Sequence, residues 1–172
     1  MSGTRRQIIL AASSPPALSS DDKKKLAEAA LAGALQIEQT AVVAYEAIAN
    51  SGRLSARATA FLRTMLDHDR QHAAQLVTAL DTMGVKAPIP PRRATIRGLA
   101  AVHDDAAAAD FAIALEERAI GAYSVAVRHL SDANVLRTVA GAMGTDGQHL
   151  VVLRQLVRRD PVPGAFERGI RP

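Results

Sequence analysis

Two short motifs in this sequence each combine an acidic residue with a histidine three positions later. They are Asp69-Arg-Gln-His72 and Asp146-Gly-Gln-His149. Residues three positions apart on a helix share a face, so each motif presents a carboxylate beside an imidazole. Oxygen and nitrogen donors arranged in this way are suited to binding a divalent metal ion.

A second pair of motifs places a glutamate seven positions before a tyrosine, once in each half of the chain. They are Glu38 with Tyr45 and Glu116 with Tyr123, and both end in Ala-Tyr. The glutamate precedes the aspartate by 31 residues in the first half and by 30 in the second. An offset near 77 residues relates the two halves throughout, which indicates an internal duplication.

The elements that carry these residues are predicted to be helices. Of the 172 residues, 48% are hydrophobic but only 3% are aromatic. Abundant alanine, and the lack of long stretches in which β-branched and polar residues alternate, favour closely packed helices over sheets. The chain has no cysteine, which excludes a disulfide scaffold, a zinc ribbon, a cysteine nucleophile and a cysteine-ligated iron–sulfur cluster.

Capping and helix-breaking residues divide the chain into a helical domain between two tails. We expect a disordered tail at 1–20, a four-helix bundle at 21–159 and a second tail at 160–172. The helices are expected to begin after Ser20-Asp21-Asp22, near Ser55, after Asp104-Asp105 and after Ser131-Asp132, and to end near residues 50, 83, 130 and 159.

The lengths of the loops predict the topology. Short loops join the first helix to the second and the third to the fourth, so each pair should form an antiparallel hairpin. The link at 84–103 is much longer. A helix of about 30 residues is about 45 Å long, a distance that about 14 extended residues would cover. We therefore expect two hairpins joined by a long crossover.

The four acids should meet near the middle of this bundle. Residues of an antiparallel hairpin lie at the same level when they are equidistant from the turn. The midpoint of Glu38 and Asp69 falls at 53.5, inside the first turn, and that of Glu116 and Asp146 falls at 131, in the second. Their helix faces also carry apolar residues such as Leu35, so the acids should point inward.

Four carboxylates in an apolar core require neutralisation. Each unpaired buried charge costs several kcal/mol, and without a counter-charge the pKa values should rise until protons bind. Two divalent cations would balance four carboxylates. The donor set suits iron or manganese, with zinc also possible.

This pattern resembles the ferritin-like superfamily of di-iron and di-manganese carboxylate proteins, over about residues 22–158. The resemblance implies terminal metal ligands at Glu38 and Glu116, bridging ligands at Asp69 and Asp146, and nitrogen ligands at His72 and His149. It also implies that Tyr45 and Tyr123 orient the ligands or donate protons during catalysis. The implied activity is oxidation of Fe(II), or reduction of O2 or peroxide.

The sequence departs from the family pattern at several points. Asp69 and Asp146 stand where the family usually has glutamate, which shortens both side chains by one methylene. Arg70 stands where bacterioferritins have a haem-ligating methionine, and the cysteines of rubrerythrin are absent. The alternative to a metalloprotein is a metal-free bundle that keeps these residues as a polar core and has a structural or partner-binding role.

Neighbouring residues are given simpler interpretations. His68 precedes His72 by one turn, but its counterpart in the second half is Thr145, so we expect a solvated histidine. Three glycines recur on the fourth helix, and close helix packing is the simple explanation, with a small channel toward the metals as the alternative. The remaining acids near the site are expected to be surface charges: Glu46, Asp67 and Glu117.

The overall charge adds little about partners. The formal net charge is +4, and no groove-reading motif accompanies it, so nucleic acid is not an expected partner. No apolar run reaches the roughly 18 residues of a membrane span. We expect a homo-oligomer, a dimer in its simplest form, in the cytoplasm, although a twin-arginine-like stretch at 4–10 leaves export open.

Overall fold

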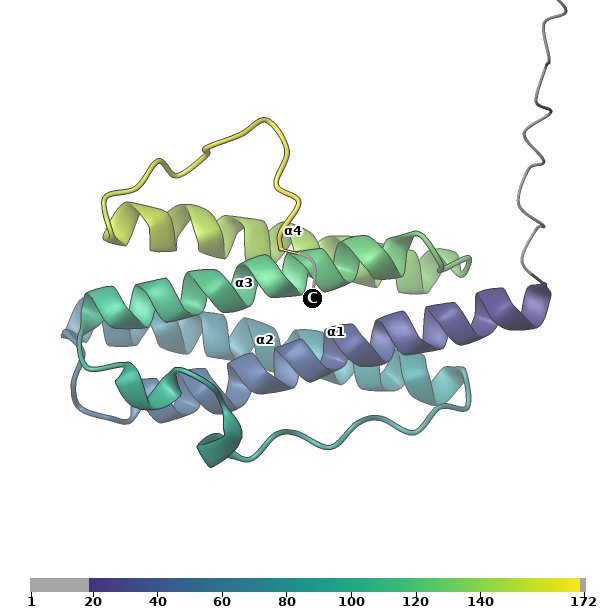
Figure 1. Cartoon of the computed structure of the whole chain (residues 1–172), viewed down its shortest axis with the longest axis horizontal. Coiled ribbons are helices and arrows are strands. Elements are labelled where there is room, and N and C mark those ends of the chain that lie inside the picture. Colours follow the sequence, from purple (N-terminus) through teal and green to yellow (C-terminus); the bar gives the residue numbers. More distant parts are fainter. Residues whose placement is uncertain (1–18, 171–172) are drawn as a thin grey trace, which may run out of the picture.

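The protein is an all-α bundle, as expected from the sequence (Figure 1). The computed structural model describes residues 19–170, so the twin-arginine-like stretch lies outside the described residues. The described part contains four α-helices and no strand. They are α1 (Ser20–Ala49), α2 (Ala56–Thr82), α3 (Asp105–Val127) and α4 (Ala133–Leu156).

Each helix begins directly after a residue whose side chain caps it. Ser19, Ser55, Asp104 and Asp132 all accept a hydrogen bond from a backbone N–H of the first turn. Because Ser19 is the cap, α1 begins slightly earlier than the sequence suggested. Helices α3 and α4 end about three residues earlier than expected. Arg158, just past the end of α4, has a φ of 56°, which is incompatible with continuing the helix.

A long crossover joins the two hairpins and runs along the bundle (Figure 1). It contains two short 3-10 turns, η1 (Arg93–Thr95) and η2 (Leu99–Ala101). The Gln39 side chain donates a 3.0 Å hydrogen bond to the Pro88 carbonyl and so ties the crossover to α1. Leu99 is buried in the core, so the crossover is also held by hydrophobic contact.

The helices do not contact one another equally. Helix α1 packs against α2 and α3, and α3 packs against α4, whereas α2 and α4 meet at few points. Two hydrophobic clusters fill the interior. On α1, residues 31–37 contribute to one cluster and residues 41–49 contribute to the other. Glu38 therefore lies between the two clusters. Asp69 and Asp146 occupy the same intermediate level on α2 and α4, which defines a polar layer near mid-bundle.

The C-terminal segment returns to the bundle after α4 (Figure 1). The backbone N–H of Ile170 donates a 2.8 Å hydrogen bond to the Glu117 carbonyl on α3. Arg154, only 7% exposed, bridges the carboxylates of Glu117 and Glu167 at 3.0 and 2.8 Å. The expectation that Glu117 is a solvated surface charge is therefore wrong, because it anchors a buried arginine and the returning segment.

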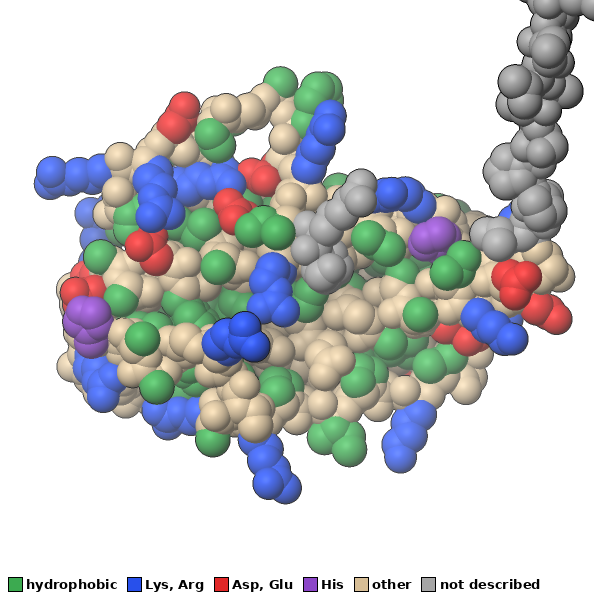
Figure 2. All heavy atoms as spheres, in the orientation of Figure 1, with side chains coloured by type: hydrophobic (Ala, Val, Ile, Leu, Met, Phe, Trp, Pro, Cys, Tyr) green, Lys and Arg blue, Asp and Glu red, His purple; other side chains and the backbone are tan. Residues whose placement is uncertain are grey.

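The surface has no single dominant charged region on the visible face. Figure 2 shows Lys and Arg side chains at several separate places, with acidic side chains among them. Among the described helices, none combines the length and the hydropathy required to cross a bilayer.

Candidate metal centre

The polar layer at mid-bundle brings together all six residues of the acid and histidine motifs. Each of the four acids is at most 2% exposed, and His149 is 4% exposed. The side chain of His72 is 12% exposed, so one edge of the layer approaches the surface. The helix faces and levels expected from the sequence therefore match the structure.

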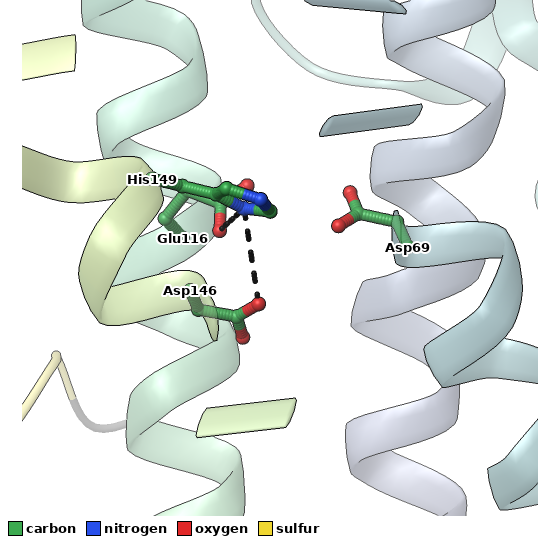
Figure 3. Close-up of side chains that lie close together, drawn as sticks. All are labelled: Asp69, Glu116, Asp146 and His149. Atoms are coloured by element: carbon green, nitrogen blue, oxygen red, sulfur yellow. Dashed lines mark hydrogen bonds and ion pairs between the residues drawn. The ribbon is translucent and has the colours of Figure 1, made fainter. Parts of the chain in front are cut away.

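The ligand atoms form two overlapping groups. The first contains Asp69, Glu116, Asp146 and His149, which extend from α2, α3 and α4 toward a common space (Figure 3). The second contains Glu38, Asp69 and His72. Within each group, one ligand atom from every residue lies within 4.8 Å of the others. Asp69 belongs to both groups, so it lies between the two positions.

Each glutamate of the layer accepts a hydrogen bond from a tyrosine on the other hairpin. The hydroxyl of Tyr45 donates to Glu116 Oε1 at 2.7 Å, and that of Tyr123 donates to Glu38 Oε1 at 2.5 Å. Both tyrosines are fully buried. Burial, followed by the charge of the bonded glutamate, raises the pKa of both tyrosines well above the ordinary value, so the hydroxyls keep their protons.

The two histidines approach the carboxylates through Nδ1. His149 Nδ1 lies 3.1 Å from Glu116 Oε2 and 4.0 Å from Asp146 Oδ1. His72 Nδ1 lies 3.5 Å from Asp146 Oδ1 and 3.6 Å from Glu38 Oε2. Asp146 thus lies near both histidines. Asp69 has a similar central place, since it belongs to both ligand groups.

The two aspartates have no satisfying partner in the described part of the protein. Both carboxylate oxygens of Asp69 and both of Asp146 are buried without a hydrogen bond there. Burial raises the pKa of Asp69 well above its ordinary value and that of Asp146 to about 10, and the neighbouring glutamates add to both effects. Burial likewise raises the pKa of Glu38. Carboxylates in this state favour either a proton or a cation.

His68 belongs to the centre, contrary to the expectation of a solvated side chain. It is half-buried, and its Nδ1 lies 2.9 Å from His149 Nε2. The two rings are almost parallel, with centroids 5.2 Å apart, and they meet edge to edge through these nitrogens. Burial and the two neighbouring histidines lower the pKa of His68. The spacing of one turn from His72 is the sequence signal for this role, although the threonine at position 145 in the other half does not repeat it.

The glycines of α4 do not serve close packing as expected. A Cβ atom added at Gly141, Gly144 or Gly147 would have no described atom of a neighbouring element within 4 Å. Gly141 instead lines a cavity of about 400 Å³ between α2 and α4. His72 and Thr145 line the same cavity, so a space next to the polar layer opens between α2 and α4, which contact each other at few points.

Comparison with known proteins places the fold in a family. A family model described as a ferritin-like domain matches residues 28–159. A solved structure of a conserved hypothetical protein from Mycobacterium tuberculosis superimposes with a TM-score of 0.69, at 20% identity, over 84% of this chain and 99% of that one. No curated protein gives a match. The long match to the family model, together with the four-helix architecture, shows that the chain belongs to the ferritin-like domain family.

Proposed function

We propose that this protein holds two divalent metal ions at mid-bundle and uses them to oxidise Fe(II) or to reduce O2 or peroxide. Iron is the metal we favour, with manganese or zinc as alternatives. The proposed ligands are the six residues of the acid and histidine motifs: Glu38, Asp69, His72, Glu116, Asp146 and His149.

The observation that carries this proposal is the pair of buried aspartates. Four oxygen atoms of Asp69 and Asp146 lack a hydrogen-bond partner among the described residues. A buried polar group without a partner is costly, and a buried charge more so. Two cations shared by four carboxylates would remove that cost, and the oxygen and nitrogen donor set fits iron or manganese.

The positions of the acids support a division of roles among the ligands. Asp69 is common to both ligand groups, and Asp146 lies between the two histidines. We assign them as bridging ligands. Glu38 and Glu116 lie in separate groups and are each held by a tyrosine, which fits terminal ligands. Although aspartate is shorter than glutamate, its oxygens still come within 4.8 Å of the other ligand atoms.

The protein's own residues orient the ligands and restrict access. When bound, the metal ions would supply the electron-transfer chemistry. Tyr45 and Tyr123 hold the two glutamates in fixed orientations, because their protonated hydroxyls donate hydrogen bonds to Glu116 and Glu38. Apolar side chains above and below the layer exclude bulk water. The cavity beside His72 offers a route for a small reactant such as O2 or peroxide.

A metal-free polar core is the second candidate, and a specific observation favours it. Tyr45, Glu116, His149 and His68 form a continuous chain of polar contacts without any ion. This chain could stabilise a structural or partner-binding bundle. It does not extend to the oxygens of Asp69 and Asp146, which is why we rank it second.

Metal analysis combined with melting separates the two candidates. The protein should be isolated from its native host, and its metal content compared with that of the His72→Ala/His149→Ala double variant. We expect bound metal in the first and little in the second, with both folded. Chelation should lower the melting midpoint only if a metal stabilises the fold. Unchanged melting, together with no oxidation of added Fe(II), would favour the metal-free candidate.

The expectation of a homo-oligomer stays a prediction. Several large hydrophobic side chains are exposed in the described chain, among them Ile89 at 79% and Phe166 at 77%. Light scattering coupled to gel filtration would measure the mass of the particle in solution.

A further inference from the structure

The imidazole of His149 has a polar partner on each side. Its Nδ1 faces the carboxylate of Glu116 at 3.1 Å, and its Nε2 faces Nδ1 of His68 at 2.9 Å. The rings of His68 and His149 are almost parallel, with an interplanar angle of 6°. Two directional contacts, one of them to an almost coplanar ring, therefore fix the orientation of this ring.

The imidazole of His72 is not held in the same way. Its Nδ1 has no hydrogen bond within the described chain, and its side chain borders the cavity between α2 and α4. The residue that corresponds to His68 in the other half is Thr145. The hydroxyl of Thr145 instead donates to the Gly141 carbonyl of its own helix, at 3.2 Å. The duplicated bundle is thus asymmetric at one position.

We infer that His68 is a positioning residue for His149, and that it makes one metal position tighter than the other. The tighter position is the one surrounded by Asp69, Glu116, Asp146 and His149. This inference rests on the proposed function, because it concerns the relative affinity of two positions within the same centre.

The reason lies in the two nitrogens of an imidazole. When Nδ1 of His149 gives its lone pair to a metal, the proton of the neutral ring must sit on Nε2. Nδ1 of His68 lies at the right distance to accept that proton in a hydrogen bond. Partners of this kind fix the tautomer and the ring orientation, and losing one typically lowers metal affinity by 10–100-fold. Among the described residues, His72 has no hydrogen-bond partner of this kind.

Substitutions at residue 68 can separate the hydrogen bond from the presence of an aromatic ring. His68→Phe keeps an aromatic ring but removes the acceptor. His68→Asn places an amide oxygen at the position of Nδ1 and so keeps the acceptor. His103→Phe makes the same change at a side chain that is 73% exposed, and it serves as the matched control.

Stepwise titration of the metal-free chain with Co(II), followed by absorption and calorimetry, supplies the test. We expect two unequal binding steps in the unmodified protein. The tighter step should weaken 10–100-fold in His68→Phe, return most of the way in His68→Asn and stay unchanged in His103→Phe. In the Zn(II)-loaded protein, NMR should detect a slowly exchanging Hε2 proton on His149, which His68→Phe should expose to exchange.

Three results would overturn the inference while leaving the proposed function intact. They are two equal steps in the unmodified protein, equal loss from both steps in His68→Phe, and no recovery in His68→Asn. Failure of the unmodified protein to bind Co(II) at all would instead reject the proposed function, and this inference with it.

Discussion

The hydroxyl of Tyr45, on α1, donates a 2.7 Å hydrogen bond to Oε1 of Glu116, on α3. The bond joins the two hairpins across the centre of the bundle. In the opposite direction, the hydroxyl of Tyr123 on α3 donates a hydrogen bond to Glu38 on α1. The duplication therefore has a structural consequence, because each half supplies the tyrosine that holds the other half's glutamate.

Removing one tyrosine hydroxyl should remove the hydrogen bond to one glutamate and leave that of the other glutamate intact. Tyr45→Phe leaves Oε1 of Glu116 without this donor, which should lower the free energy of unfolding of the metal-free protein by about 1–3 kcal/mol. In double-mutant cycles measured by urea unfolding, Tyr45→Phe should couple to Glu116→Gln by about 0.5 kcal/mol or more. Tyr123→Phe is the matched control and should couple to Glu38→Gln instead. If Tyr45→Phe coupled as strongly to Glu38→Gln as to Glu116→Gln, the assignment of each tyrosine to the glutamate of the other hairpin would be contradicted.

Replacing a buried aspartate by its amide should stabilise the metal-free fold. Asp146→Asn keeps the shape of the side chain but removes an acid that the folded state keeps protonated, since it is buried without a partner in the described chain, whereas the unfolded chain ionises it. At pH 8 we expect the chelated variant to gain at least about 1 kcal/mol in unfolding free energy, and to bind less metal. Asp67→Asn, at an exposed acid on α2, should change stability by less than about 0.5 kcal/mol. A destabilised Asp146→Asn would argue against the electrostatic account.

The stability of the chelated protein should fall as the pH rises. In the folded state burial raises the pKa of Asp69, and raises that of Asp146 to about 10, so these groups hold protons that the unfolded chain releases above about pH 4. The unfolded state then binds fewer protons, and the unfolding free energy decreases by at most about 1.4 kcal/mol per pH unit for each retained proton. Urea unfolding between pH 5.5 and 8 would measure the slope.

Metal should change that dependence, because carboxylates must lose their protons to act as ligands. With saturating Mn(II), stability should rise between pH 5.5 and 7.5. Parallel slopes with and without metal would show that these acids are not the ligands.

Two glycine substitutions should have opposite effects. Gly144→Ala adds a Cβ atom where no described atom of a neighbouring element lies within 4 Å, so it should stabilise α4 by about 0.4–1 kcal/mol in thermal melts. At Gly121 on α3, a Cβ atom would overlap the Ile170 carbonyl. Gly121→Ala should therefore release the C-terminal segment and speed tryptic cleavage at Arg159. Destabilisation by Gly144→Ala would restore the close-packing interpretation.

Periodicity and loop length were enough to predict the four helices, the two hairpins and the meeting of the six motif residues. Those features depend on helix geometry alone: spacing sets the face, and distance from the turn sets the level. The ends of α3 and α4 were less accurate, since Leu130 and Arg159 follow the helices without any strong breaking residue.

Contacts between hairpins could not be predicted, because they depend on how one hairpin is rotated against the other. The exchange of tyrosines and the approach of His68 to His149 are both of this kind. Comparison of the two halves cannot reveal the role of His68, because the duplication has diverged at Thr145. The return of the C-terminal segment to Glu117 was likewise missed, since residues 160–170 have no periodic pattern.

Anomalous X-ray diffraction from crystals grown with Mn(II) tests the central claim most directly. The account predicts two anomalous peaks at mid-bundle, with Asp69 and Asp146 between them and one histidine on each. Repeating the measurement with Asp69→Asn/Asp146→Asn should remove both peaks. A map of the unmodified protein without anomalous density there, and with both aspartates in their present positions, would contradict it.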